Sequence, residues 1–166
     1  MQNQEKTFKV VIVGDGNTGK TAFINRLLTG NFSDQYTPTV GVEIHPLKFT
    51  SRTGKQFTFN CFDCAGKDEF GGLRDDYYLQ ADAFIVFATT EENTNKWLVE
   101  TLDSGLVKPD TPCVLVSSKT DIEHWPEWVS IASKRRNLPW VAISTKNNDD
   151  MQYPFNILME KLDHHF

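Results

Sequence analysis

Residues 8–21 read FKVVIVGDGNTGKT, and this stretch decides how the rest of the chain is interpreted. Its first six residues form an apolar run that is typical of a buried parallel strand. The run ends at Gly14, where the pattern G-x-x-x-x-G-K-T begins, and a helix is predicted to start within residues 19–21. Glycines let backbone N–H groups turn inward toward phosphate oxygens, and the following helix dipole adds to that attraction. The stretch therefore predicts a phosphate-binding loop.

The end of this loop supplies a charge and a metal ligand. Lys20 is predicted to reach the β- and γ-phosphates of a nucleotide, and the Thr21 hydroxyl to bind Mg²⁺. The alternative, a glycine-rich turn with a surface lysine, requires a chance match expected in about one chain of this length in a few hundred. The predicted nucleotide contacts come from the loop and its first helical residues: Asp15, Gly16, Asn17, Thr18, Gly19, Lys20, Thr21 and Ala22.

Strands and helices alternate along the remainder of the chain. Further strands are predicted over residues 42–50, 56–63, 83–88, 113–116 and 141–143. The helix after the phosphate loop is predicted to end at Gly30. Further helices are predicted over residues 75–79, 96–106, 126–136 and 154–162. The strands on either side of Thr53-Gly54 alternate apolar and polar residues, which is typical of a hairpin. The pattern predicts an α/β fold: a mostly parallel six-stranded sheet with one antiparallel strand and helices on both faces.

Composition restricts the class of protein. The chain has 166 residues, 39% of them hydrophobic, which fits one domain over residues 1–166. Its formal net charge of −5 gives no reason to expect direct binding of nucleic acid. No apolar run approaches the roughly 18 residues of a membrane span. Three cysteines are too few for a disulfide framework and favour a reducing compartment. With neither a secretory leader nor a lipid-anchor motif, we expect a soluble intracellular protein.

A second motif, residues 118–121 (SKTD), follows the predicted strand over 113–116. The Asp121 carboxylate can accept two parallel hydrogen bonds from guanine, whereas adenine would leave it unpaired, and such pairing discriminates by about 10⁴ or more. The stem of Lys119 can lie along the base. Ser118 belongs to the same loop, and a set after the last strand would complete the pocket: Ser144, Thr145 and Lys146. A solvated lysine–aspartate turn is the alternative, which a preceding phosphate loop makes the weaker one.

The segment DCAG, residues 63–66, ends the predicted strand over 56–63. Asp63 can hold Mg²⁺ through water, and the N–H of Gly66 can meet the γ-phosphate. Cys61 and Cys64 form a C-x-x-C, but residues three apart on an extended strand face opposite sides. Because no second ligand pair lies nearby, we interpret both cysteines as small buried residues and not as zinc ligands.

Together these motifs resemble the small GTPases of the Ras superfamily, and most closely its Ran branch of nuclear-transport GTPases. Residues 41–47 (GVEIHPL) resemble that branch after switch I, and residues 70–78 (FGGLRDDYY) resemble its switch II. Residues 137–138 and 143–146 continue the likeness, which covers roughly residues 8–162. The resemblance implies a P-loop GTPase fold, the G domain, that binds GTP or GDP with Mg²⁺.

The resemblance also implies roles for further residues. Thr39 would close over Mg²⁺ and the γ-phosphate, and Phe32 would pack edge-on against guanine. Residues 134–136 (KRR) fall where the family has a basic cluster that meets acidic transport receptors, although a solvated helix end explains them equally well. The implied partners are importin- or exportin-type receptors and a nucleotide exchange factor, for a monomer without a membrane anchor in nucleus and cytoplasm. The tryptophans are assigned to packing only: Trp97, Trp125, Trp128 and Trp140.

The chain departs from the family most clearly at Lys67, where the family has glutamine. A glutamine amide accepts a hydrogen bond from the attacking water, whereas an ammonium group has three donors and no acceptor. The catalytic set that the resemblance implies is Lys67, Thr39 and Gly66. With lysine in place of glutamine, we expect slow GTP hydrolysis that the usual activating protein does not accelerate.

Lesser departures are Ser118 for asparagine, Cys64 for threonine and Asn17 for glycine. At position 118, serine is shorter than asparagine, so we expect one bond between the base loop and the phosphate loop to stay unmade. At position 17, Asn17 adds a side chain beside a crowded phosphate, although asparagine tolerates unusual backbone angles. The chain also stops where the family's last helix ends, so we do not expect recognition by Ran-binding domains.

Three functions remain open at this stage. The first is a GTP-dependent switch that hydrolyses GTP slowly. The second is a GTP-locked mimic or decoy that occupies transport receptors without hydrolysis, which Lys67 and the missing tail favour. The third is a P-loop kinase, which would need an acceptor pocket and an arginine-rich lid; the sequence has neither, and Asp121 favours guanine.

Overall fold

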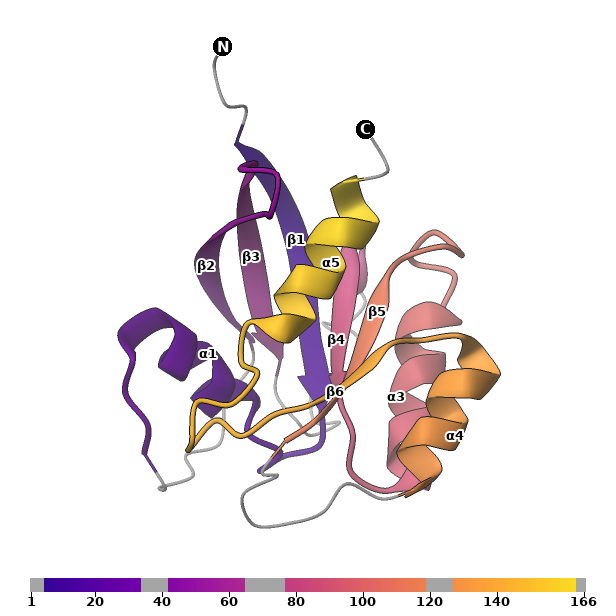
Figure 1. The fold of residues 1–166 in the computed structure, drawn as a ribbon. Coiled ribbons are helices and arrows are strands. Elements are labelled where there is room, and N and C mark those ends of the chain that lie inside the picture. The colour runs from indigo at the N-terminus through magenta and orange to yellow at the C-terminus, as the bar shows by residue number, and fades with distance from the viewer. Residues whose placement is uncertain (1–4, 34–41, 65–76, 119–126, 164–166) are drawn as a thin grey trace.

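The computed structural model describes residues 5–33, 42–64, 77–118 and 127–163 of the chain (Figure 1). Its sheet has six strands in the order β2-β3-β1-β4-β5-β6. The strands are β1 (Lys6–Gly14), β2 (Val42–Thr50), β3 (Gln56–Cys64), β4 (Ala83–Phe87), β5 (Cys113–Ser117) and β6 (Trp140–Ala142). Only β2 runs antiparallel to its neighbour among these strands. The predicted fold class and the hairpin are confirmed.

Helices cover both faces of the sheet, as predicted. The described helices are α1 (Lys20–Thr29), α3 (Glu91–Leu102), α4 (Glu127–Arg136) and α5 (Tyr153–Asp163). Phe23 of α1 and Phe155 of α5 pack on one face, against β1 residues such as Ile12. Trp97 of α3 packs on the other face, against β1 residues such as Val13. In Figure 1, α4 lies beside α3.

The helix ends agree with the prediction for α1 and differ for α3. Helix α1 ends at Gly30, whose φ of 76° is the left-handed conformation that glycine adopts without strain. Helix α3 begins at Glu91, five residues before the predicted start at residue 96. The reason is an N-cap: the Thr90 hydroxyl accepts a hydrogen bond from the Asn93 N–H at 3.1 Å. Of the helix predicted over 75–79, the first two residues lie outside the described ranges.

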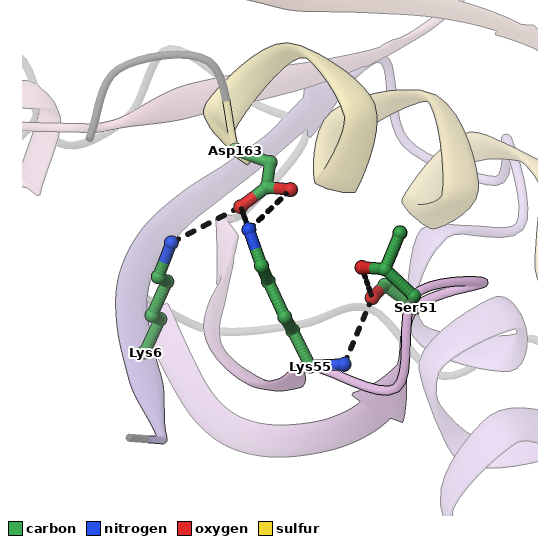
Figure 2. Close-up of polar contacts among 5 residues, drawn as sticks. Lys6, Ser51, Lys55 and Asp163 are labelled. Atoms are coloured by element: carbon green, nitrogen blue, oxygen red, sulfur yellow. Dashed lines mark hydrogen bonds and ion pairs between the residues drawn. The ribbon is translucent and has the colours of Figure 1, made fainter. Parts of the chain in front are cut away.

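An ion-pair cluster joins α5 to the sheet at the end of β1 that is far from the phosphate loop (Figure 2). The Asp163 carboxylate accepts hydrogen bonds from Lys6 Nζ at 3.0 Å and from Lys55 Nζ at 2.8 and 2.9 Å. These bonds hold the pKa of Asp163 below its ordinary value. The backbone N–H of Lys55 also donates to Ser51 Oγ at 3.1 Å, which closes the β2–β3 turn.

The cysteine interpretation is confirmed as far as packing goes. Cys61 lies in the core on the α1 and α5 side of the sheet, and Cys64 lies in the core on the α3 side. Burial raises the pKa of Cys61 to about 12, so its thiol stays protonated at neutral pH. Within the described part of the chain, no helix has both the length and the apolar character needed to cross a membrane.

Candidate functional site

The loop between β1 and α1 has a backbone that its glycines make possible. At Gly14, a Cβ atom would lie 2.9 Å from both the Cβ and the carbonyl oxygen of Phe87, so a larger residue does not fit. Gly19 has a φ of 93°, and Asn17 has a φ of 60°. The expectation that asparagine tolerates an unusual backbone angle at position 17 is confirmed. The result is a tight curl at the carboxyl end of β1, where an open α/β sheet binds its ligand.

Lys20 lies inside this curl and not on the surface. Its ammonium group donates hydrogen bonds to the carbonyl oxygens of Gly14 at 2.8 Å and Asp15 at 2.7 Å, and to Thr18 Oγ1 at 3.4 Å. Burial lowers the pKa of Lys20 to about 8, although the charges of Asp63 and Asp15 act in the opposite direction. A cation held here among carbonyl groups is placed to meet a polyphosphate that enters the loop. The alternative of a surface lysine is therefore wrong.

Thr21 and Asp63 form the predicted metal end of the site. The Thr21 hydroxyl donates to Asp63 Oδ2 at 2.5 Å. Asp63 is fully buried at the end of β3, and its Oδ1 has no hydrogen-bond partner among the described residues. Burial raises the pKa of Asp63, whereas the Thr21 bond and the charge of Lys20 lower it. Hydroxyl and carboxylate oxygens are the ligands that Mg²⁺ prefers, so these residues fit the ion. That Thr21 would bind it directly and Asp63 through water stays a prediction.

The loop after β5 contacts the phosphate loop. Ser118 Oγ donates to the carbonyl oxygen of Thr18 at 2.5 Å, and the Ser118 side chain would lie 3.7 Å from a Cβ at Gly19. Serine therefore makes a bond between these loops, and the expectation that it leaves one of the bonds available to asparagine unmade stays a prediction. The two loops approach closely enough for a short side chain to span them.

The structure brings two of the predicted base-pocket residues to the same end of the sheet. The Ile143 N–H donates to the Ser117 carbonyl at 2.8 Å, which holds the start of the segment 144–146 beside the end of β5. Ser144 and Thr145 are buried, and Lys146 is exposed. Phe32 is half-buried after α1. Ser144 and Thr145 therefore lie at the end of the sheet where the phosphate loop lies.

Five of the predicted site residues lie outside the described residues: Thr39, Gly66, Lys67, Lys119 and Asp121. Their proposed contacts with Mg²⁺, the γ-phosphate and guanine stay predictions.

The structure adds three residues that the sequence analysis did not place at the site. The Asp15 carboxylate accepts hydrogen bonds from Thr89 Oγ1 at 2.6 Å, Asn93 Nδ2 at 2.9 Å and Trp97 Nε1 at 2.9 Å. Trp97 is buried, as expected for packing, but its indole N–H also contacts the phosphate loop. The Thr90 cap was the available signal, because a helix starting at Glu91 puts Asn93 and Trp97 on one face.

Comparison with known protein families finds a match over most of the chain. The model that describes the Ras family matches residues 9–164. The matched range includes residues 9–14 of β1, the phosphate loop, Asp63 and the segments after β5 and β6, so it covers every part of the site built above.

Proposed function

Because the chain belongs to the Ras family of small GTPases, which are GTP-binding switches, we propose that it acts as a Ran-like switch whose bound nucleotide controls binding to nuclear transport receptors. The main structural support is the position of Asp63. It bonds to Thr21 after the phosphate loop and lies near the end of β3, seven positions before residue 70, where the segment that resembles switch II begins. A change at the metal and phosphate that moves Asp63 would therefore act on the strand that leads to that segment.

The Ran-like part of the proposal is supported by the sequence of two segments. Residues 41–47 and 70–78 resemble the Ran branch around its switches; the first segment includes the start of β2, and the second follows β3 in the sequence. A difference between GTP and GDP at Asp63 would change the surface that these segments present. Family membership by itself supports the switch and not the receptor.

Basic residues at the end of α4 support an acidic partner. Lys134 and Arg135 are exposed in the last turn, whereas Arg136 pairs with Asp103 at 3.1 Å. Two exposed cations are therefore available to a receptor, and one is occupied within the protein. This division refines the equal weighting of a receptor contact and a solvated helix end: Arg136 has a structural partner, and the other two have the exposure that a contact requires.

The test is receptor binding in two nucleotide states. The protein is loaded with GDP or with a non-hydrolysable GTP analogue, and its affinity for an importin-type receptor is measured by calorimetry. We expect the GTP form to bind at least about 10-fold more tightly, which corresponds to about 1.4 kcal/mol. Equal affinity in both states, or no binding in either, would contradict the proposal.

A charge reversal tests the basic cluster separately. The double variant Lys134→Glu/Arg135→Glu should weaken receptor binding by the GTP form, because it replaces attraction to an acidic surface with repulsion. Arg52→Glu reverses the charge of an exposed cation in the β2–β3 turn, and each single variant, Lys134→Glu or Arg135→Glu, changes the net charge by the same amount. Arg52→Glu is therefore the control for the single variants and should bind as the wild type does. If Arg52→Glu and the single variants weaken binding equally, net charge and not this cluster is responsible.

A second candidate, the GTP-locked mimic or decoy, is favoured by Lys67. Without the glutamine amide to position water, bound GTP would persist. The nucleotide released on denaturing the purified protein distinguishes the two candidates: GDP supports a working switch, and GTP supports the locked form. Release of neither would contradict both.

A further inference from the structure

The Asp15 carboxylate of the phosphate loop accepts hydrogen bonds from three side chains of α3 and the segment just before it. Thr89 precedes α3, Asn93 and Trp97 lie within it, and all three donate to Asp15 at 2.6 to 2.9 Å. Thr89 and Asn93 share Oδ2, and Trp97 bonds to Oδ1. Both oxygens are thus used, and the carboxylate is fixed against α3.

The position of Asp15 is unfavourable by simple electrostatics. A negative side chain in a loop that binds a polyphosphate should repel the ligand. Burial raises the pKa of Asp15, but its bonds to Thr89, Trp97 and Asn93 and the charge of Lys20 outweigh burial, so the pKa lies below its ordinary value. Asp15 is therefore ionised at neutral pH. Because this negative charge opposes phosphate binding, we expect a favourable contribution of Asp15 elsewhere in the loop.

The backbone of the same residue provides that contribution. The carbonyl oxygen of Asp15 accepts a hydrogen bond from Thr18 Oγ1 at 2.8 Å and one from Lys20 Nζ at 2.7 Å. Thr18 and Lys20 are both buried. Asp15 thus joins α3, through its side chain, to two residues of the curl, through its carbonyl. Movement of Asp15 would therefore disturb both the contact with α3 and the bonds from Thr18 and Lys20.

We propose that Asp15 is a positioning residue: anchored by Thr89, Asn93 and Trp97, it holds the phosphate loop against α3 and lengthens the residence time of bound nucleotide. The inference rests on the nucleotide binding that the family implies, and it adds α3 as the element that supports the loop. Asp15 acts through the backbone of the loop and not by contact between its carboxylate and the phosphates.

Charge and position predict opposite results for Asp15→Asn. Removing a negative charge near phosphate should slow nucleotide release if charge alone matters. If positioning matters, release should become faster by about 10-fold or more, because a charge-assisted network is lost. Trp97→Phe keeps the charge and removes one donor, so it should accelerate release by about 3- to 10-fold. Trp128→Phe, a half-buried tryptophan on α4, is the matched control and should leave release unchanged.

The experiment measures dissociation of a fluorescent GDP from each full-length variant in excess unlabelled GDP and Mg²⁺. A double-variant cycle separates positioning from lost packing, and it uses Asp15→Ala because asparagine keeps one acceptor oxygen. Once Asp15→Ala has removed both carboxylate oxygens, Trp97→Phe should add little further acceleration. Additive effects of the two changes, or release from Asp15→Asn as slow as from the wild type, would overturn the inference. If the wild type itself binds neither GDP nor GTP, nucleotide binding fails, and not the anchor.

Discussion

The bond between Ser118 and the phosphate loop permits a sharp test. Ser118→Ala removes a hydroxyl that donates to the Thr18 carbonyl, and with it a direct link between the loop after β5 and the phosphate loop. A neutral hydrogen bond contributes about 0.5–1.5 kcal/mol, which corresponds to about 2- to 13-fold in a rate or equilibrium constant. We therefore expect nucleotide to leave the Ser118→Ala variant about 2- to 13-fold faster than the wild type.

The neighbouring residue supplies a control of the same type. Ser117 is buried at the end of β5, and its Oγ has no hydrogen-bond partner among the described residues. Ser117→Ala removes the same atom one position earlier but breaks no such bond, and it relieves an unsatisfied buried group. Its release rate should match the wild type, and its free energy of unfolding should be equal or slightly higher.

The assay is the decay of fluorescence from a labelled GDP, followed under excess unlabelled GDP with Mg²⁺ present. Unfolding in denaturant, measured on both variants, shows whether either change weakens the fold as a whole. Equal release from Ser118→Ala and Ser117→Ala would refute the reasoning. So would faster release from Ser118→Ala accompanied by a matching loss of overall stability.

Three further predictions concern charge. Lys20 has a pKa of about 8 in the fold against 10.5 in the unfolded chain, so between these pH values the unfolded chain holds more protons. The free energy of unfolding of the nucleotide-free protein should therefore rise with pH over this range, by up to about 3 kcal/mol. Denaturant unfolding measures this rise, and the Lys20→Met variant should lack it. Lys67→Gln should accelerate single-turnover GTP hydrolysis, and an unchanged rate would contradict the role assigned to that position. The bonds from Lys55 and Lys6 lower the pKa of Asp163, so its carboxylate contributes stability above pH 3.8 that is lost as the pH falls further. In thermal unfolding, the Asp163→Asn variant should therefore lose less stability than the wild type as the pH falls below 3.8.

Local patterns were enough to predict most of the architecture. Apolar runs of strand length, the alternation on either side of Gly54 and the stop at Gly30 each depend on neighbouring residues, and the structure has an element at each place. The start of α3 was wrong although its signal was local. The apolar residues from position 96 onward favour a late start, whereas the Thr90 cap with two glutamates after it indicates the observed one.

Motif spacing likewise predicted Lys20, Thr21 and Asp63, which the structure brings together. The partners of Asp15 could not be found in this way. They are 74 to 82 residues away along the chain, and they reach Asp15 because β1 pairs in parallel with β4, Gly14 opposite Phe87. That pairing places the loop after β1 beside the start of α3.

The amino-acid sequence alone determined that this chain has a phosphate loop on an α/β sheet, because glycine spacing and apolar periodicity act within a few residues. The tertiary structure decided what holds the loop: Ser118 spanning to Thr18, Asp15 fixed by α3, and Lys20 buried with a pKa near 8. Those properties depend on distances between distant segments and on exclusion of water, which no local pattern specifies.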